Sequence, residues 1–349
     1  MINLKNFFYS SVIFIITIFL INSEFIGNFY WQAASLFADH NLLVDWLECN
    51  SIGVNLYTLE ELICNDRKVP LFNYGHVLLL FPWHEQLDTF YRFYMPYSII
   101  FIFIFLTIKI FNPQKRIEKV LLILCLLSPS TLLGFDRLNI DLFIYISVAV
   151  ICFNRVYFIN WFLTLLMSFI KIYPAALFIN IFFENPNRLR KNIIYIVAIL
   201  SLLTLVYFFY FKEYILFFLN NISAGRAGYH FLFSLNALPK IFKYVFNFNY
   251  QLMLIIFYSL FIYSTIKLYS NNIVNLKETK IDIFSTNSKL FMMGGFLTLI
   301  NFLFFSNWFY REIFLILTLP YLLNFKSEVK TNAYSWIIYI FIARYLFLF

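Results

Sequence analysis

The stretch 156-VYFINWFLTLLMSFIKIYPAALFINIFF-183 is an apolar run of 28 residues, interrupted at its centre by Lys171 and Pro174. A helix of about 20 apolar residues is enough to cross the hydrocarbon core of a bilayer. The run therefore forms either one long tilted helix or two short helices that meet at Lys171-Ile-Tyr-Pro174. The choice between them decides on which side of a membrane every later segment lies.

Outside this run, the composition is that of a polytopic membrane protein. Of the 349 residues, 62% are hydrophobic and only 13% are charged, and long apolar runs recur along the chain. Backbone that crosses lipid must satisfy its own hydrogen bonds, so we expect helices. We predict one all-α integral membrane domain, 1–349, with about eleven transmembrane helices. No small-residue cleavage site follows the first apolar run, so we expect that run to be retained as a helix.

The eleven predicted helices count the interrupted run as two. Their approximate ranges are Asn6–Ile26, Tyr91–Phe111, Val120–Phe135, Ile140–Phe153, Val156–Phe183 (two helices), Asn192–Phe211, Gln251–Tyr269, Leu290–Phe305, Ile313–Phe325 and Ser335–Phe349.

The distribution of charge favours two short helices at the interruption. With the N-terminus inside, the cytoplasmic side then carries 15 Lys and Arg against 5 acids, and the outer side carries 11 against 13. This excess of positive charge inside is what the positive-inside rule expects. It places the polar interval 28–90, the turn at 136–141 and Lys171 on the outer face.

The interval 28–90 is too long for a simple connector, so we expect an extracytoplasmic loop with structure of its own. It contains Cys49 and Cys64, fifteen residues apart. An outer compartment permits oxidation, so we predict a disulfide between them, with two free thiols as the alternative. Such a bond stabilises the fold by about 3 kcal/mol on the chain-entropy model.

Two polar features interrupt the apolar segments. The stretch Gly134-Phe-Asp-Arg-Leu-Asn-Ile-Asp141 brings two carboxylates, an Arg and an Asn into one helix–helix turn. Asp141 could simply cap the helix that follows, but capping does not explain Arg137 and Asn139. Lys171 is costly between apolar helices unless it faces a partner or a cavity, or reaches the membrane surface.

Together these features resemble the α-mannosyltransferases of the GT-C superfamily that depend on polyprenyl-phosphate-mannose. Those proteins usually show Glu-Arg-Gly-Asn-x-Asp, and a Lys-x-x-Pro some thirty residues later; here Asp136 replaces Glu and Leu138 replaces Gly. Further short motifs are similar to those of an uncharacterised bacterial branch. They are Phe37-Ala-Asp39, Gly53-Val-Asn-Leu-Tyr57, Cys64-Asn-Asp-Arg67, Phe72-Asn-Tyr-Gly75 and Tyr310-Arg311.

The resemblance implies an enzyme of the bacterial cytoplasmic (inner) membrane, with its active site on the extracytoplasmic face. It would move a hexose, which is mannose in the resembling family, from a polyprenyl-phosphate-linked donor to a glycan or glycolipid acceptor. The configuration at the anomeric carbon would be inverted. Inversion by one displacement needs one general base, and a phosphate leaving group needs cations rather than a proton donor. By the resemblance the base is Asp39, with Asp45 as the second candidate, and a solvated loop carboxylate is the structural alternative for either.

The remaining candidate residues fall into two groups. The cations expected at the donor phosphate are Arg137, Lys171, Arg311, Arg226 and His230. The supporting residues are Asp136, Asn139, Asp141, Asp66, Arg67, Asn73, Tyr74 and Tyr310.

Other classes of function find less support. The sequence contains no Gly-rich nucleotide loop and no pair of His residues at helical spacing with a Glu, so we expect no cofactor and no protein-bound metal. The net charge of +8 arises from the excess of Lys and Arg in the predicted inner loops, so it does not indicate a nucleic-acid partner. We expect membrane lipid as a partner and no nucleic acid. A flippase or transporter of lipid-linked saccharides, or a polysaccharide polymerase or ligase, remains the alternative.

Overall fold

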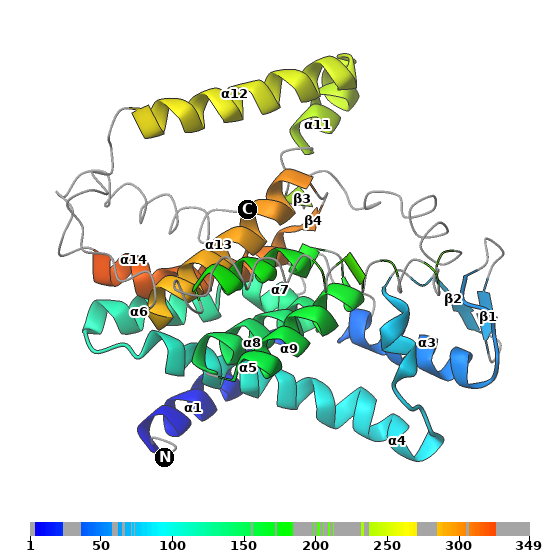
Figure 1. Ribbon diagram of the computed structural model, residues 1–349. Helices are drawn as coiled ribbons and strands as arrows, with labels where there is room; N and C mark the ends of the chain where they lie inside the picture. Colours follow the sequence, from blue (N-terminus) through cyan, green and yellow to red (C-terminus); the bar gives the residue numbers. More distant parts are fainter. Residues whose placement is uncertain are drawn as a thin grey trace. The chain divides into compact units, whose positions relative to one another are not determined.

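The computed structural model describes residues 4–23, 36–57, 62–64, 67–70, 72, 74–154, 156–171, 173–183, 232–233, 237–270, 285–304 and 307–325, with isolated positions between 198 and 212. Over these residues the protein is mostly helical (Figure 1). The chain divides into two compact units, one of residues 1–109 and 132–223, the other of residues 110–131 and 224–349.

The first unit contains most of the N-terminal half of the chain. Its α-helices are α1 (Leu4–Ile21), α3 (Ala38–Ser51), α4 (Glu85–Thr89), α5 (Met95–Phe111, of which the last two residues belong to the second unit), the C-terminal part of α7 (Pro129–Arg137), α8 (Asp141–Phe153) and α9 (Tyr157–Ile170). Its other elements are the 3-10 helices η1 (His76–Leu80) and η3 (Tyr173–Phe183), the π-helical turn η2 (Phe90–Tyr94), and the antiparallel strands β1 (Leu62–Cys64) and β2 (Arg67–Val69).

The second unit is also helical. Its elements are α6 (Arg116–Leu126), the first residues of α7, α11 (Ala237–Phe246), α12 (Tyr250–Ser270), α13 (Thr286–Phe304), η6 (Phe309–Thr318), α14 (Leu319–Phe325) and the paired strands β3 (Leu232–Phe233) and β4 (Asn307–Trp308). Helix α13 and η6 approach closely at Gly294, where an added Cβ would lie 2.6 Å from the Phe314 carbonyl oxygen.

Helix α8 forms the centre of the first unit. It is apolar over most of its surface, and most of its residues are buried, with Leu142, Ile144 and Val148 fully so. Its Tyr145 packs on Phe103 of α5 with ring centroids 4.2 Å apart. Because α8 begins at Asp141, its first carboxylate is carried into a buried position.

Two apolar ranges are broken in the structure, one of them as predicted and the other against the prediction. The range 156–183 is divided into α9 and η3 around Lys171, so the predicted break is confirmed. The range 120–135 was expected to form one helix, and that prediction is wrong. The chain forms α6 and α7, with a bend of 45° between them at Leu127 and Ser128. The helices expected at 192–211 and 335–349 lie outside the described residues, apart from isolated positions.

Some of these helices could cross a membrane. Among the described residues, Leu4–Ile21 and Glu85–Phe111 are long and apolar enough to cross a bilayer, and the bent pair α6–α7 makes a third if it counts as one span. A mostly helical protein with candidate membrane spans is therefore observed. The arrangement of eleven spans stays a prediction.

The polar interval expected to be an ordered loop does form structure. Its main element is α3, which buries His40, Val44 and Leu47 on one face at the i, i+4, i+7 spacing of a helix. The interval also contains the hairpin β1–β2 and the short helix η1. Asp39, placed by sequence in a loop, thus lies in the first turn of a helix.

Candidate active site

Helix α3 begins at a docking point on the end of α7. Phe37, just before α3, has a left-handed φ of 60°, and its amide donates to the Asp136 carbonyl oxygen at 2.6 Å. A non-glycine residue in this region is strained and persists only where its surroundings hold it. The Phe37 ring packs edge-on against Tyr97, and this contact helps to stabilise the left-handed backbone of Phe37. Asp39 follows two residues later.

Helix α7 ends in a Schellman motif centred on Leu138. The Leu138 amide donates to the Phe135 carbonyl, and the Asn139 amide to the Gly134 carbonyl, which is the bonding pattern of that motif. Leu138 itself has a φ of 44°, the left-handed conformation that favours glycine. This tight turn presents Arg137 and Asn139 on the same side, where both contact Asp39.

Both oxygens of the Asp39 carboxylate accept hydrogen bonds from this turn. Arg137 Nη2 donates to Asp39 Oδ1 at 2.5 Å, and Asn139 Nδ2 donates to Asp39 Oδ2 at 2.5 Å. The side chains of Asp39 and Arg137 are 14% and 19% exposed, so the ion pair is only partly screened by solvent. Two segments about a hundred residues apart in sequence are joined here.

The network continues from Asn139 to the break between α9 and η3. Lys171 Nζ donates to Asn139 Oδ1 at 3.1 Å and to Asp141 Oδ1 at 2.6 Å. The Tyr173 hydroxyl donates to the same Asp141 oxygen at 2.5 Å. Asp141 is fully buried and the Lys171 side chain is 11% exposed, and a buried charge of this kind requires a partner.

We call these six residues the polar network: Asp39, Arg137, Asn139, Asp141, Lys171 and Tyr173.

A segment of the polar interval packs beside Lys171. The Gly75 amide donates to the Ile170 carbonyl at 3.0 Å, and a Cβ on Gly75 would lie 1.6 Å from the Phe169 carbonyl oxygen. Only glycine fits so close an approach. The approach places the ring of Tyr74 with its centroid 5.3 Å from Lys171 Nζ, within cation–π distance.

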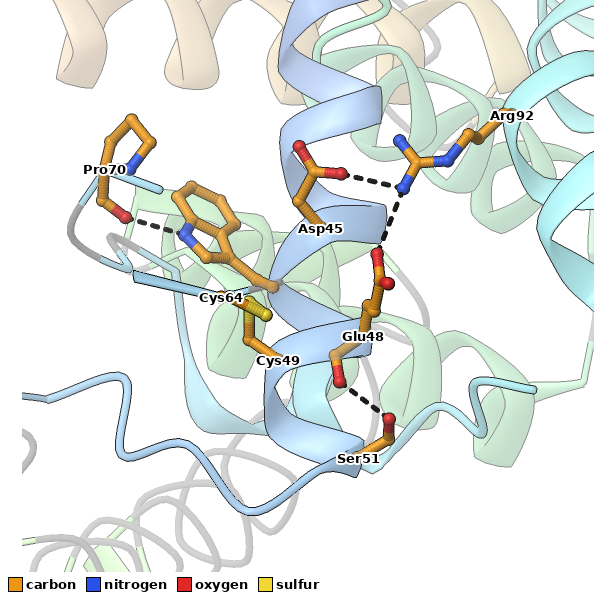
Figure 2. The surroundings of a disulfide bond; sticks show 8 residues. Asp45, Glu48, Cys49, Ser51, Cys64, Pro70 and Arg92 are labelled. Atoms are coloured by element: carbon orange, nitrogen blue, oxygen red, sulfur yellow. Dashed lines mark hydrogen bonds and ion pairs between the residues drawn. A yellow bond between two sulfur atoms is a disulfide. The ribbon is translucent and has the colours of Figure 1, made fainter. Parts of the chain in front are cut away.

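Asp45 occupies a different ionic cluster on the same helix. Arg92, in η2, donates to Asp45 Oδ1 at 2.7 Å and to Asp88 Oδ1 at 2.7 Å, and its Nη2 lies 3.6 Å from Glu48 Oε2. Figure 2 shows Asp45 and Glu48 on one side of α3, facing Arg92. The two candidate bases thus have different partners.

The predicted disulfide is present and anchors the other end of α3. Cys49 in α3 is bonded to Cys64 in β1 (Figure 2). The indole of Trp46 donates to the Pro70 carbonyl at 2.8 Å, and Trp46 is almost fully buried. The hairpin is therefore attached to α3 by a covalent bond and a buried aromatic residue.

The predicted residues divide into those in the polar network and those elsewhere. Asp39, Arg137, Asn139, Asp141 and Lys171 come together, Tyr74 borders them, and Asp136 contributes its backbone carbonyl. Arg311 belongs to the second unit, where its Nη1 donates to Asn301 Oδ1 at 2.9 Å.

For six predicted residues no side-chain position is described. Asp66, Asn73, Arg226 and His230 lie outside the described residues, and Arg67 and Tyr310 are described only as backbone in β2 and η6.

Sequence reasoning missed two residues. Tyr173, inside the quoted Lys171-to-Pro174 break, is the second donor to Asp141; a hydroxyl two residues from a lone Lys could have indicated it. Arg92, at the end of the polar interval, is the partner of Asp45. Its spacing of four residues from Asp88 is the usual signal for such an ion pair.

The arrangement is suited to proton transfer at a fixed carboxylate. Within the polar network, two cationic side chains stand against the carboxylates of Asp39 and Asp141. Each ionised oxygen has about two lone-pair sites, so a substrate hydroxyl could still donate to Asp39. No group of three His, Cys, Asp or Glu residues suited to a metal ion occurs in the described part of the chain.

The chain was compared with protein families, curated proteins and solved structures. No protein-family model, curated protein or solved structure matches the chain.

Proposed function

We propose that the protein is a membrane glycosyltransferase of the GT-C type that uses a polyprenyl-phosphate-linked hexose as donor. The observation that carries the proposal is the Asp39 carboxylate, held by Arg137 and Asn139 at 2.5 Å each. It follows the first apolar helix, as the resembling mannosyltransferases require of their base. The finer expectations belong to the same proposal: eleven spans, a bacterial inner membrane and an outward-facing site.

The reaction is a single displacement at the anomeric carbon. The acceptor oxygen forms a bond to C1 of the sugar, and the bond from C1 to the phosphate oxygen breaks with its electron pair going to the phosphate. The proton of the acceptor hydroxyl passes to an oxygen of Asp39. One carboxylate is enough for this chemistry, since the configuration inverts and no covalent intermediate forms.

Arg137 has a specific role in this scheme. The reaction moves one negative charge from Asp39 to the departing polyprenyl phosphate, because the carboxylate gains a proton while the phosphate loses its ester bond to sugar. The Arg137 guanidinium has five N–H donors in a planar fork, a geometry that matches the oxygens of a carboxylate and of a phosphate. A cation aimed at developing charge lowers the barrier.

Lys171 is better suited to hold the turn than to bind the donor. Its ammonium is bonded to the buried Asp141 and to Asn139, so a phosphate would have to compete with a short, largely buried ion pair. We therefore assign the donor phosphate to Arg137 among the residues of the polar network. Lys171 positions the turn from which Arg137 and Asn139 reach Asp39.

The surroundings of the two acids favour Asp39 over Asp45 as the base. Asp45 shares Arg92 with Asp88 and lies in an acidic cluster that includes Glu48. These contacts indicate a structural role for Asp45, whose ion pair with Arg92 connects α3 to η2. Asp39 instead contacts the turn that carries the motif residues Arg137 and Asn139.

The proposal is tested by following the fate of the lipid donor. Purified protein in lipid vesicles is given polyprenyl-phosphate-mannose and an envelope glycolipid acceptor, with guanosine-diphosphate-mannose as the alternative donor. We expect acceptor-dependent release of polyprenyl phosphate from the lipid donor alone, with an inverted anomeric product. Transfer from the nucleotide sugar, or movement of the lipid-linked sugar across the bilayer without release, would count against a lipid-dependent transferase.

A further inference from the structure

Asn139 connects the two ion pairs of the polar network through the two ends of one side-chain amide. Its Nδ2 donates to Asp39 Oδ2 at 2.5 Å. Its Oδ1 accepts from Lys171 Nζ at 3.1 Å and from the Asp141 backbone amide at 3.1 Å. Asn139 is 3% exposed, so these bonds are formed with little competition from water.

The chemistry of its neighbours determines which way this amide points. An ammonium and a backbone N–H can only donate, so the atom facing them must be the oxygen. An ionised carboxylate can only accept, so the atom facing Asp39 must be the nitrogen. Turning the amide over would place like groups together at three contacts, and the side chain is therefore held in one orientation.

We infer that Asn139 is the positioning residue that orients the Asp39 carboxylate for proton abstraction, an inference that rests on the proposed function. The Arg137 bond fixes Asp39 Oδ1, and the Asn139 bond fixes Oδ2, so together they fix the plane of the carboxylate. The backbone bond from Asp141 ties the Asn139 amide to the first turn of α8, where Asp141 and Leu142 are fully buried. The carboxylate is thus aligned against a buried helix start.

No other residue type satisfies these contacts at this position. Asp at 139 would place a second carboxylate against Asp39 Oδ2, and like charges at this distance share a proton instead of both ionising. Ser would not reach both neighbours, and an apolar residue would leave buried donors without partners.

The inference predicts two measurable effects of Asn139→Asp. The thermal unfolding midpoint of this variant falls by about 5 °C relative to the wild type at pH 8, and the difference shrinks at pH 5, where the pair is protonated. The rate of donor release, as kcat/KM, falls about 10- to 100-fold. The acid limb of its pH profile moves up by about one pH unit.

An interchange variant separates positioning from general damage to the fold. In Asp39→Asn/Asn139→Asp the carboxylate and the amide change places, so a complementary bond forms again and Lys171 gains an ionic partner. We expect this double variant to unfold at a higher temperature than Asn139→Asp at pH 8, while donor release stays lost. Asn160→Asp is the matched control, because Asn160 is also 3% exposed but lies in α9, and its effect should not depend on Asp39.

The outcomes are distinct. Asn139→Asp with a wild-type midpoint and an unmoved pH profile overturns the inference, and so does a double variant whose midpoint change is the sum of the two single changes. The unfolding measurements need no substrate. If the wild type releases no polyprenyl phosphate at all, the proposed function fails, while the unfolding cycle still decides whether Asn139 holds Asp39.

Discussion

His40, next to Asp39, is a buried side chain whose protonation opposes folding. Its Nε2 lies 2.8 Å from the Tyr91 carbonyl oxygen, and a carbonyl can only accept, so the neutral ring must carry its proton on Nε2. Burial lowers the pKa of His40 below its ordinary value of 6.5, and the nearby Arg92 lowers it further, against the opposing effect of the Tyr91 bond.

The lowered pKa predicts a loss of stability in mild acid. The unfolded chain takes up a proton at His40 as the pH falls below about 6.5, whereas the folded chain resists until a lower pH. Between these two values stability falls by up to about 1.4 kcal/mol per pH unit. We expect thermal unfolding between pH 7 and 5 to show this slope, and His40→Gln, which keeps a donor to Tyr91, to reduce it.

His84→Gln is the control for this experiment, because His84 is exposed. The same slope in the wild type and in His40→Gln would show that other groups, such as His76, whose pKa burial also lowers, govern the acid sensitivity.

At the scale of elements, the docking of the polar interval on the end of α9 depends on one glycine. Gly75 lies against the Phe169 carbonyl, and the segment that it docks brings Tyr74 to Lys171. Gly75→Ala should therefore destabilise the protein by about 1–3 kcal/mol, as overpacking does. It should also lower donor release, because the Tyr74 ring would move away from Lys171.

Gly295→Ala is the matched control. Gly295 lies in α13, and an added Cβ meets nothing within 4 Å, so alanine should be neutral or stabilise the helix by up to about 1 kcal/mol. Equal unfolding midpoints for the two variants would contradict the docking described here.

Much of the polar network could be predicted from sequence, but its connections could not. Charged and amide residues inside apolar sequence, such as Arg137, Asn139 and Lys171, are noticeable because they are costly there. The partner of each one depends on which helix ends meet, and that is decided by contacts distant in sequence. The α3 helix was missed for the same reason: its apolar face is short, and burial of Val44 and Leu47 decides it rather than a long periodic pattern.

The broken run shows where local sequence is sufficient. Pro174 lacks an amide donor and disfavours helix in the residue before it, and Lys171 resists burial without a partner, so a break there was predictable. The bend between α6 and α7 is marked only by Ser128 and Pro129, and a proline at the start of a helix is ordinary. The prediction of a continuous helix is therefore wrong at Ser128 and Pro129.

At the scale of the whole molecule, the main prediction is the membrane topology, with the N-terminus inside and the interval 28–90 outside. The candidate span Glu85–Phe111 should have its N-terminal end outside and its C-terminal end inside. Gln86 is the second residue of this span, Gln114 follows its last residue by three positions, and both are exposed. With the membrane intact, a membrane-impermeant thiol reagent should label Gln86→Cys and leave Gln114→Cys unlabelled.

The native cysteines do not interfere with this measurement, since Cys49 and Cys64 are bonded and Cys125 and Cys152 are buried. Labelling of Gln114→Cys and not of Gln86→Cys would invert the assignment and place the polar network on the cytoplasmic side.

The most direct test of the central claim, that Asp39 is the general base, is the donor-release rate of Asp39→Asn beside that of Asp45→Asn. Asn keeps the size of Asp39 but cannot take the acceptor proton, and a general base contributes about 10²- to 10⁴-fold to rate. We expect a loss in kcat of that size for Asp39→Asn with the donor KM within a few-fold of wild type, and a rate close to wild type for folded Asp45→Asn. Full turnover by Asp39→Asn, with loss in Asp45→Asn, would contradict it.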